Sequence, residues 1–250
     1  MKIMSRDTLK ELVGAFILLY GGTGVGKSVS TIQSCPDKLL WMLSEARSTH
    51  RMLRAANRPD LHYDVALYEG WNPFIAFNAN FKNFEKYDTV FLDSASHLMN
   101  IRLAGEIMGE NFDALPDKDR GIKSISKVAK MSQEAWGVLA TQMNRLSNLH
   151  MKLANEEGKT VIWSALEISA PKWDRALIGA PGFGGQMYNR DFPGFFDLIG
   201  RVEQRVNDDG EIVYPPMVYF ESPNGDFTAK ATGDMETTSS PLDWTKILNL

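Results

Sequence analysis

The chain contains very little cysteine and no long hydrophobic run. Cys35 is its single cysteine, which excludes an intramolecular disulfide framework and a cysteine-rich zinc module. The longest strongly apolar run covers residues 15–20, far fewer than the ~20 residues that span a bilayer. The N-terminal stretch MKIMSRDTLKEL carries two acidic side chains and has no apolar centre, unlike a secretory signal. We therefore expect a soluble intracellular protein with no membrane partner.

The composition is that of an ordinary globular domain. Lysine and arginine together number 27, against 31 aspartate and glutamate residues, which gives a formal net charge of −4. Hydrophobic residues make up 44% and charged residues 23%, which excludes a disordered or collagen-like chain. The mild acidity argues against a generic nucleic-acid coat protein, but it says nothing about local patches. At 250 residues we expect one large domain at 1–233 and a C-terminal tail at 234–250.

Short apolar runs alternate with helix-like segments along most of the chain. This alternation predicts an α/β fold with a mainly parallel sheet flanked by helices. We expect strands at 16–20, 39–43, 63–68, 89–92 and 160–166, and antiparallel strands at 198–206, 212–221 and 227–231. We expect helices at 27–34, 46–57, 74–84, 94–108 and 133–155. The segments 111–130, 168–193 and 237–241 have loop-like or linker-like composition.

The strongest motif lies between the first expected strand and the first expected helix. It matches the phosphate-binding pattern G-x-x-x-x-G-K-[ST] and consists of Gly21, Gly22, Thr23, Gly24, Val25, Gly26, Lys27 and Ser28. Glycines let successive backbone N–H groups point at phosphate oxygens, and the helix N-terminus adds positive potential. Lys27 would reach the β- and γ-phosphates, and the Ser28 hydroxyl would ligate Mg²⁺. An ordinary strand-to-helix turn is the alternative, but the flanking strand and helix are the context that the motif requires.

A phosphate-binding loop needs a carboxylate near Mg²⁺, at the end of a neighbouring strand. The run Thr89-Val90-Phe91-Leu92-Asp93 has this Walker B pattern, and Asp93 would hold a magnesium-bound water. The alternative reading is that Asp93 only caps the helix that follows.

Hydrolysis also needs a group that orients or deprotonates water. Glu45 follows the second expected strand, at the strand end where substrates meet α/β sheets. The alternative is an ordinary glutamate in the first turn of a helix. Glu167 is the second choice for this role, and Ser164 could sense the γ-phosphate.

The runs YGGTGVGKS, LLWMLSE and TVFLDSASHL resemble the RecA-like ATPase core, including the Asp-Ser pair after the Walker B strand. More closely, the chain is similar to small phage-encoded P-loop ATPases of RecA type that are implicated in single-strand annealing and recombination. In those proteins a Trp-rich helix, a strand and a Pro/Gly loop follow Walker B, as at 136–149, 161–167 and 192–198 here. A later phrase matches Ala229-Lys230, so the resemblance covers roughly residues 14–233.

The resemblance implies ATP and Mg²⁺ as cofactors, assembly into a ring or filament, and single-stranded DNA as partner. It also implies Glu45 as the water-activating carboxylate, and Lys230 as a group that reaches the ATP of a neighbouring subunit. Phage recombination or replication proteins would be further partners, and the location would be the host cytoplasm.

The chain departs from the family pattern at two places. Leu166 stands where such proteins often have a histidine, which removes a γ-phosphate sensor. Ala231 stands where an arginine often follows the lysine, so an arginine finger supplied to a neighbour would come from elsewhere. The candidates for that finger are Arg175, Arg190 and Arg201.

Two stretches of the chain are locally basic, and either could contact DNA phosphates. The first choice is the expected long loop at 111–130, whose part 117–130 contains Lys118, Arg120, Lys123, Lys127 and Lys130. The other is a helical face with Arg47, His50, Arg51, Arg54 and Arg58. The segment 168–186 could add aromatic side chains that stack on bases. The alternative for all of them is an ordinary solvated surface.

Two rival functions remain open. One is a phage packaging or assembly protein in which ATP acts as a switch and the partner is a protein. The other is a small-molecule phosphotransferase, a class that usually carries an arginine-rich lid. The long loop contains one arginine, which disfavours that class.

Overall fold

The computed structural model describes residues 14–45, 48–113, 131–169, 171, 174, 176–232, 235 and 237–248. Its strands are β1 (Ala15–Gly21), β2 (Leu39–Leu43), β3 (Tyr63–Leu67), β4 (Thr89–Asp93), β5 (Thr160–Ser169), β6 (Gly179–Pro181), β7 (Leu198–Val206), β8 (Ile212–Tyr219) and β9 (Ser239–Pro241). Its α-helices are α2 (Lys27–Ser34), α3 (Thr49–Ala56), α4 (Trp71–Ala79), α5 (Ala95–His97), α6 (Ala104–Asp113), α8 (Gln133–Glu157), α9 (Gln186–Asp191) and α10 (Trp244–Ile247). Shorter turns of helix are η1 (Phe81–Phe84), the π-helical η2 (Leu98–Leu103) and η4 (Phe192–Gly194).

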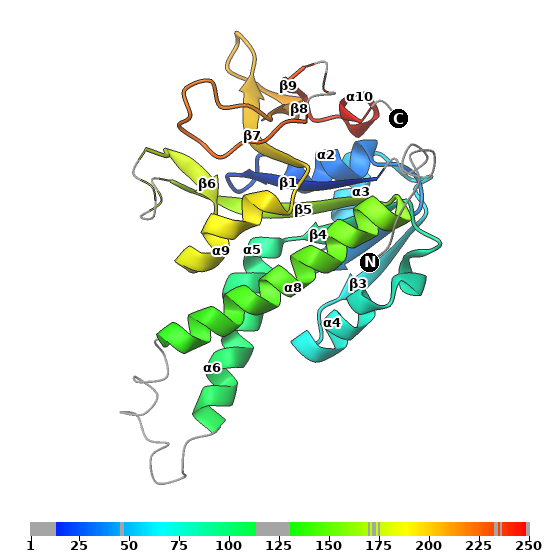
Figure 1. Ribbon diagram of the computed structural model, residues 1–250. Coiled ribbons are helices and arrows are strands. Elements are labelled where there is room, and N and C mark those ends of the chain that lie inside the picture. The colour runs from blue at the N-terminus through cyan, green and yellow to red at the C-terminus, as the bar shows by residue number, and fades with distance from the viewer. Residues whose placement is uncertain are drawn as a thin grey trace.

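The strands form one sheet in the order β3-β2-β4-β5-β1-β7-β8-β9, with β6 attached to β5. The pairs from β3 to β7 are parallel, whereas β8 and β9 add antiparallel strands at one side. Helices α2 and α3 cover one face of the sheet, and α8 crosses the other face (Figure 1). The predicted α/β fold class, with a mainly parallel sheet and antiparallel C-terminal strands, is confirmed.

Two apolar layers hold the helices against the sheet, because successive strand residues point to opposite faces. In β1, Phe16, Leu18 and Tyr20 pack in the layer beneath α8. Ile17 and Leu19 pack in the layer beneath α2. Strands β1, β2 and β4 are buried almost throughout, which explains their continuous apolar sequences.

The long helix α8 has clear signals at both ends. Ser132 caps it by accepting a hydrogen bond from the Ala135 amide at 3.1 Å. Gly158 ends it in the left-handed conformation, with a φ of 67°. Its inward residues Leu139, Met143, Leu146 and Leu153 are fully buried, whereas Trp136 near its start is 38% exposed.

Other parts of the secondary-structure prediction are wrong. The segment 168–193 contains β6, α9 and η4 rather than a continuous loop. Residues 227–231 make two isolated bridges, with Gly179 and Ile199, instead of a strand. The polar stretch 237–241 contains β9, which pairs with β8. In each case pairing with a distant segment decides the local structure, and composition does not report it.

Several expectations concern residues that the structure does not describe. The basic loop residues Lys118, Arg120, Lys123, Lys127 and Lys130 lie outside the described residues, as does Arg175. In the segment set apart as a tail, Trp244 is fully buried and its amide donates to the Ser34 hydroxyl at 3.0 Å. Within the described ranges, we find no helix with the length and apolar character needed to cross a membrane.

Candidate nucleotide-binding site

The loop between β1 and α2 has the backbone shape that the glycine motif predicts. Gly24 and Gly26 have φ values of 80° and 96°, in the left-handed region that glycine adopts most readily. Gly21 lies too close to the Val202 carbonyl for a side chain to fit. Gly26 is the N-cap of α2, so the first N–H groups of this helix face the loop.

Lys27 folds back over the loop that precedes it. Its ammonium donates to the carbonyl oxygens of Gly21 at 2.9 Å and Gly22 at 2.8 Å. The positive charge therefore sits at the mouth of the loop, where the motif places a phosphate group.

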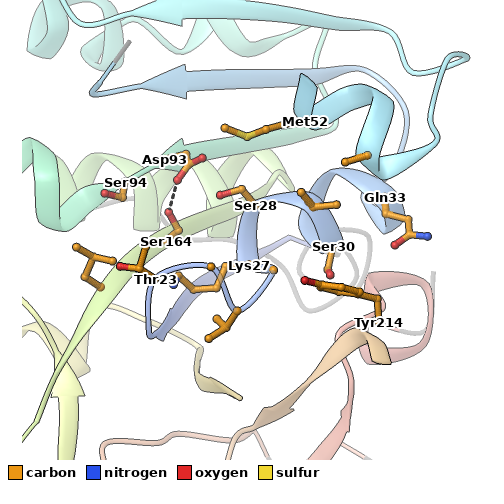
Figure 2. Close-up of a pocket in the computed structure, with 16 residues that line it drawn as sticks. Thr23, Lys27, Ser28, Ser30, Gln33, Met52, Asp93, Ser94, Ser164 and Tyr214 are labelled. Atoms are coloured by element: carbon orange, nitrogen blue, oxygen red, sulfur yellow. Dashed lines mark hydrogen bonds between the residues drawn. The ribbon is translucent and has the colours of Figure 1, made fainter. Parts of the chain in front are cut away.

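A cavity of about 550 Å³ opens beside the loop (Figure 2). Thr23–Ser28 of the loop, Asp93 and Ser94 at the end of β4, and Ser164 of β5 line it together. In Figure 2 the side chains of Ser28, Asp93 and Ser164 gather at one end of this cavity, and Tyr214 lies toward the other. The strand order explains this grouping, because β5 lies between β1 and β4 and all three are parallel.

Asp93 is almost fully buried, at 1% exposed. Its Oδ1 atom accepts a hydrogen bond from the Ser164 hydroxyl at 2.7 Å. The Asp93–Ser94 peptide bond is cis. The structure thus places a buried carboxylate and a hydroxyl on neighbouring strands, in the cavity that the phosphate-binding loop also lines.

Residues 14–238 match the family model described as an AAA domain. The chain belongs to the AAA domain family. The match covers the phosphate-binding loop, the Asp93 strand and the antiparallel strands β7 and β8. It assigns this AAA domain to the P-loop ATPases, which bind nucleotides. A search of the curated proteins gives no match to the chain.

In the AAA domain, Glu45 lies one residue beyond a tightly held serine. Ser44 is 1% exposed, and its amide donates to the Asp93 carbonyl at 3.2 Å. Its hydroxyl accepts from the Ser94 amide at 3.1 Å and donates to the Ser94 carbonyl at 2.9 Å. Glu45 itself is partly buried and lies outside the set of described residues that line the cavity. Its water-activating role stays a prediction.

Glu167, the second choice for that role, is held in an ion pair. Its Oε1 atom accepts from Arg201 Nε at 2.8 Å, and Arg201 Nη1 lies 2.6 Å from Glu203. The Arg201 guanidinium also lies over the Phe227 ring, 5.1 Å from its centroid. Neither Glu167 nor Arg201 lines the cavity of the AAA domain.

Lys230, expected to reach a neighbouring subunit, contacts its own chain. Its ammonium donates to the Pro193 carbonyl at 3.2 Å and to the Phe196 carbonyl. Lys230 would have to leave these oxygens before it could reach another molecule. Of the proposed basic helix face, Arg58 is likewise engaged, because it donates to the Gln33 and Cys35 carbonyls at 3.1 Å.

Sequence reasoning missed most of the apolar wall of the cavity. Beside Val25 of the predicted motif, this wall comprises Val29, Met52, Ala55 and Tyr214. Tyr214 comes from β8, and its ring would lie 3.0 Å from a Cβ placed on Gly26. Since no local pattern links β8 or α3 to the loop, the sequence carries no signal for these two contributions.

Proposed function

We propose that the chain is a magnesium-dependent ATPase. The observation that carries this proposal is that Thr23–Ser28 and Asp93 line the same cavity. The phosphates of ATP would lie on the loop from Gly21 to Ser28, close to Lys27. The base would lie against the apolar wall, where Met52 and Tyr214 offer surfaces of the kind that ring systems contact.

The residues present suit a magnesium ion. Mg²⁺ prefers oxygen ligands and is usually bound through one or two carboxylates together with substrate phosphates. The Ser28 hydroxyl and the Asp93 carboxylate supply such oxygens, Asp93 through a bound water. In this place the ion would neutralise charge on the β- and γ-phosphate oxygens.

The chain's own groups would then carry out the reaction. Lys27 would exchange its contacts with the Gly21 and Gly22 carbonyls for the β- and γ-phosphates, which carry the opposite charge. Glu45 would align a water molecule for in-line attack on the γ-phosphate and accept its proton. The bond between the γ-phosphorus and the bridging β-phosphate oxygen would break, and ADP and phosphate would leave. Ser164, whose hydroxyl donates to Asp93, would sense the γ-phosphate through this hydrogen bond.

Nucleotide hydrolysis by the wild-type chain and by Lys27→Ala tests this proposal. We expect the variant to lose most of its activity, because the charge at the phosphate site is gone. Lys152→Ala, at an exposed position on α8, is the control and should keep wild-type activity. Equal activity of Lys27→Ala and wild type would remove the proposed mechanism.

We further propose that the protein acts as a homo-oligomer on single-stranded DNA in phage recombination, single-strand annealing or replication. The sequence resemblance and the basic composition of residues 117–130 support this part of the proposal. Hydrolysis and oligomeric mass should both rise when single-stranded DNA is added. The measurement is made at low salt, because contacts with DNA phosphates weaken as salt increases. Absence of DNA binding at low salt would favour instead the nucleotide-switched phage packaging or assembly protein.

A further inference from the structure

The segment that follows Asp93 sends three polar side chains to the backbone of other segments. The Ser96 hydroxyl accepts from the Leu166 amide at 3.0 Å. Asn100 donates to the Gly182 carbonyl at 2.7 Å. Arg102 Nε donates to the Ser44 carbonyl, also at 2.7 Å. Asn100 and Arg102 both lie in the π-helical turn η2, a form of helix that is rare and frequent at functional sites.

The contact of Arg102 completes the set of bonds on Ser44. The amide and hydroxyl of Ser44 are bonded to the backbone of Asp93 and Ser94. The carbonyl is the remaining polar group of this residue, and Arg102 holds it from another element. Every polar group of a buried serine at the end of β2 is therefore fixed relative to the Asp93 strand.

Fixing this carbonyl also fixes the start of Glu45. A peptide unit is planar, so the Ser44 Cα, C and O atoms lie in one plane with the nitrogen and Cα of Glu45. With Ser44 anchored at its amide and hydroxyl, the direction of its carbonyl sets the orientation of that plane. The position of the Glu45 Cα, and the direction from which its side chain departs, follow from it.

We infer that Arg102 is a positioning residue for Glu45. This inference rests on the proposed function, in which Glu45 aligns the attacking water. Arg102 lies outside the described residues that line the cavity, so it acts on Glu45 through Ser44 and not on the nucleotide. Arg102 is exposed, so its replacement leaves the buried core layers intact.

A merely structural role for Arg102 has a distinct signature. The Arg102 charge also acts on Tyr68, whose phenol donates to Glu106 at 2.6 Å. Glu106 in turn accepts from the Trp71 amide at 3.0 Å. If Arg102 serves only the cluster of Tyr68, Trp71 and Glu106, its loss will lower the melting temperature and leave turnover per folded molecule unchanged.

The experiment compares Arg102→Met, Arg102→Lys, Glu45→Gln and the double variant Glu45→Gln/Arg102→Met. Methionine keeps an unbranched stem but has no group that donates a hydrogen bond to the Ser44 carbonyl. We expect Arg102→Met to lower kcat by about 10- to 100-fold, the range expected when a reacting group is misplaced by an ångström. KM for ATP and the melting temperature should stay near wild type. Arg102→Lys should recover part of the rate, because an ammonium can donate to the same carbonyl. Arg145→Met, at an exposed position on α8, is the matched control and should change nothing.

The double variant separates positioning from other effects. If Arg102 acts through Glu45, adding Arg102→Met to Glu45→Gln will cause no further loss of kcat. Three results would each overturn the inference: wild-type kcat in Arg102→Met, a further loss in the double variant, or a fall in melting temperature alone. A wild-type chain without ATP hydrolysis would overturn the proposed function, and the inference with it.

Discussion

Asp93 depends on a neighbouring strand for part of its hydrogen bonding. Its carboxylate is 1% exposed, and the Ser164 hydroxyl donates to it from β5 at 2.7 Å. A buried carboxylate is stable only when donors replace the water that it has lost. Ser164 therefore contributes to folding as well as to any role that it has in sensing the γ-phosphate.

Replacing Ser164 with alanine should lower the free energy of unfolding by about 1–3 kcal/mol, because it removes a donor from a buried charged group. Denaturant unfolding of the nucleotide-free protein measures the effect. Thr141→Ala is the control, since its exposed hydroxyl only donates to the Gly137 carbonyl within α8. Unfolding free energies within about 0.5 kcal/mol of wild type for Ser164→Ala would contradict the prediction.

The sequence predicted those site residues that belong to one local pattern. The loop from Gly21 to Ser28 is a continuous strand-turn-helix, and Asp93 ends an apolar strand, so each can be recognised without the fold. Met52, Tyr214 and Arg102 carry no such pattern. They reach the site because α3, β8 and η2 pack beside it, and that packing is decided by the whole chain.

The same distinction holds for whole elements. The sequence patterns predicted α2 and β2 with their correct ends and most of α8. The π-helical form of η2 was not predicted, because its residues are compatible with an ordinary helix. The short strands β6 and β9 have almost no apolar pattern, and they exist because β5 and β8 offer them partners.

Strand β7 illustrates how closely the antiparallel extension packs on the sheet. A Cβ on Gly200 would lie 2.5 Å from Val218 Cγ2 and 2.8 Å from Phe220 Cε1, both on buried side chains. We expect Gly200→Ala to destabilise the fold by about 1–3 kcal/mol, the usual effect of overfilling a core. The free energy of unfolding in denaturant measures this effect.

The matched control is an alanine at a glycine with open space. Gly105 lies exposed in α6, and a Cβ there would have no atom within 4 Å. Gly105→Ala should stabilise the protein by about 0.5–1 kcal/mol, because alanine loses less conformational freedom in a helix. Equal effects of the two substitutions would show that the packing at β7 does not matter.

On the scale of the whole molecule, one buried histidine joins three elements. His150 of α8 accepts at Nδ1 from the Trp163 indole at 2.7 Å, and its Nε2 lies 2.6 Å from Asn78 Oδ1. An indole N–H only donates, so Nδ1 carries no proton and Nε2 donates to Asn78. Both partners are neutral, and burial lowers the pKa of His150 to about 3. The folded state therefore keeps this ring uncharged.

Stability should fall as the pH drops from 6.5 toward 3. In the unfolded chain His150 has a pKa near 6.5 and takes up a proton in this range, whereas the folded state does not. The contribution is about 1.4 kcal/mol per pH unit, or about 2 kcal/mol between pH 6.5 and 5. Unfolding free energies at pH 7, 6 and 5 measure it.

A glutamine at position 150 provides the comparison. His150→Gln should be less stable at neutral pH, because the ring packs against Phe16 and Trp163. Its stability should nevertheless depend less on pH between 6.5 and 5 than that of the wild type. An unchanged pH dependence would show that other groups account for the acid sensitivity.

The strand order has a consequence for the newly made chain. β1 carries the phosphate-binding loop, yet it lies between β5 and β7, which are synthesised much later. Ser34 at the end of α2 likewise awaits Trp244, a partner 210 positions further along. A ribosome that has released only the first half of the chain therefore presents the loop on a strand with both edges unpaired. Nucleotide can stabilise the finished domain, but its site is completed only when the C-terminal strands have emerged.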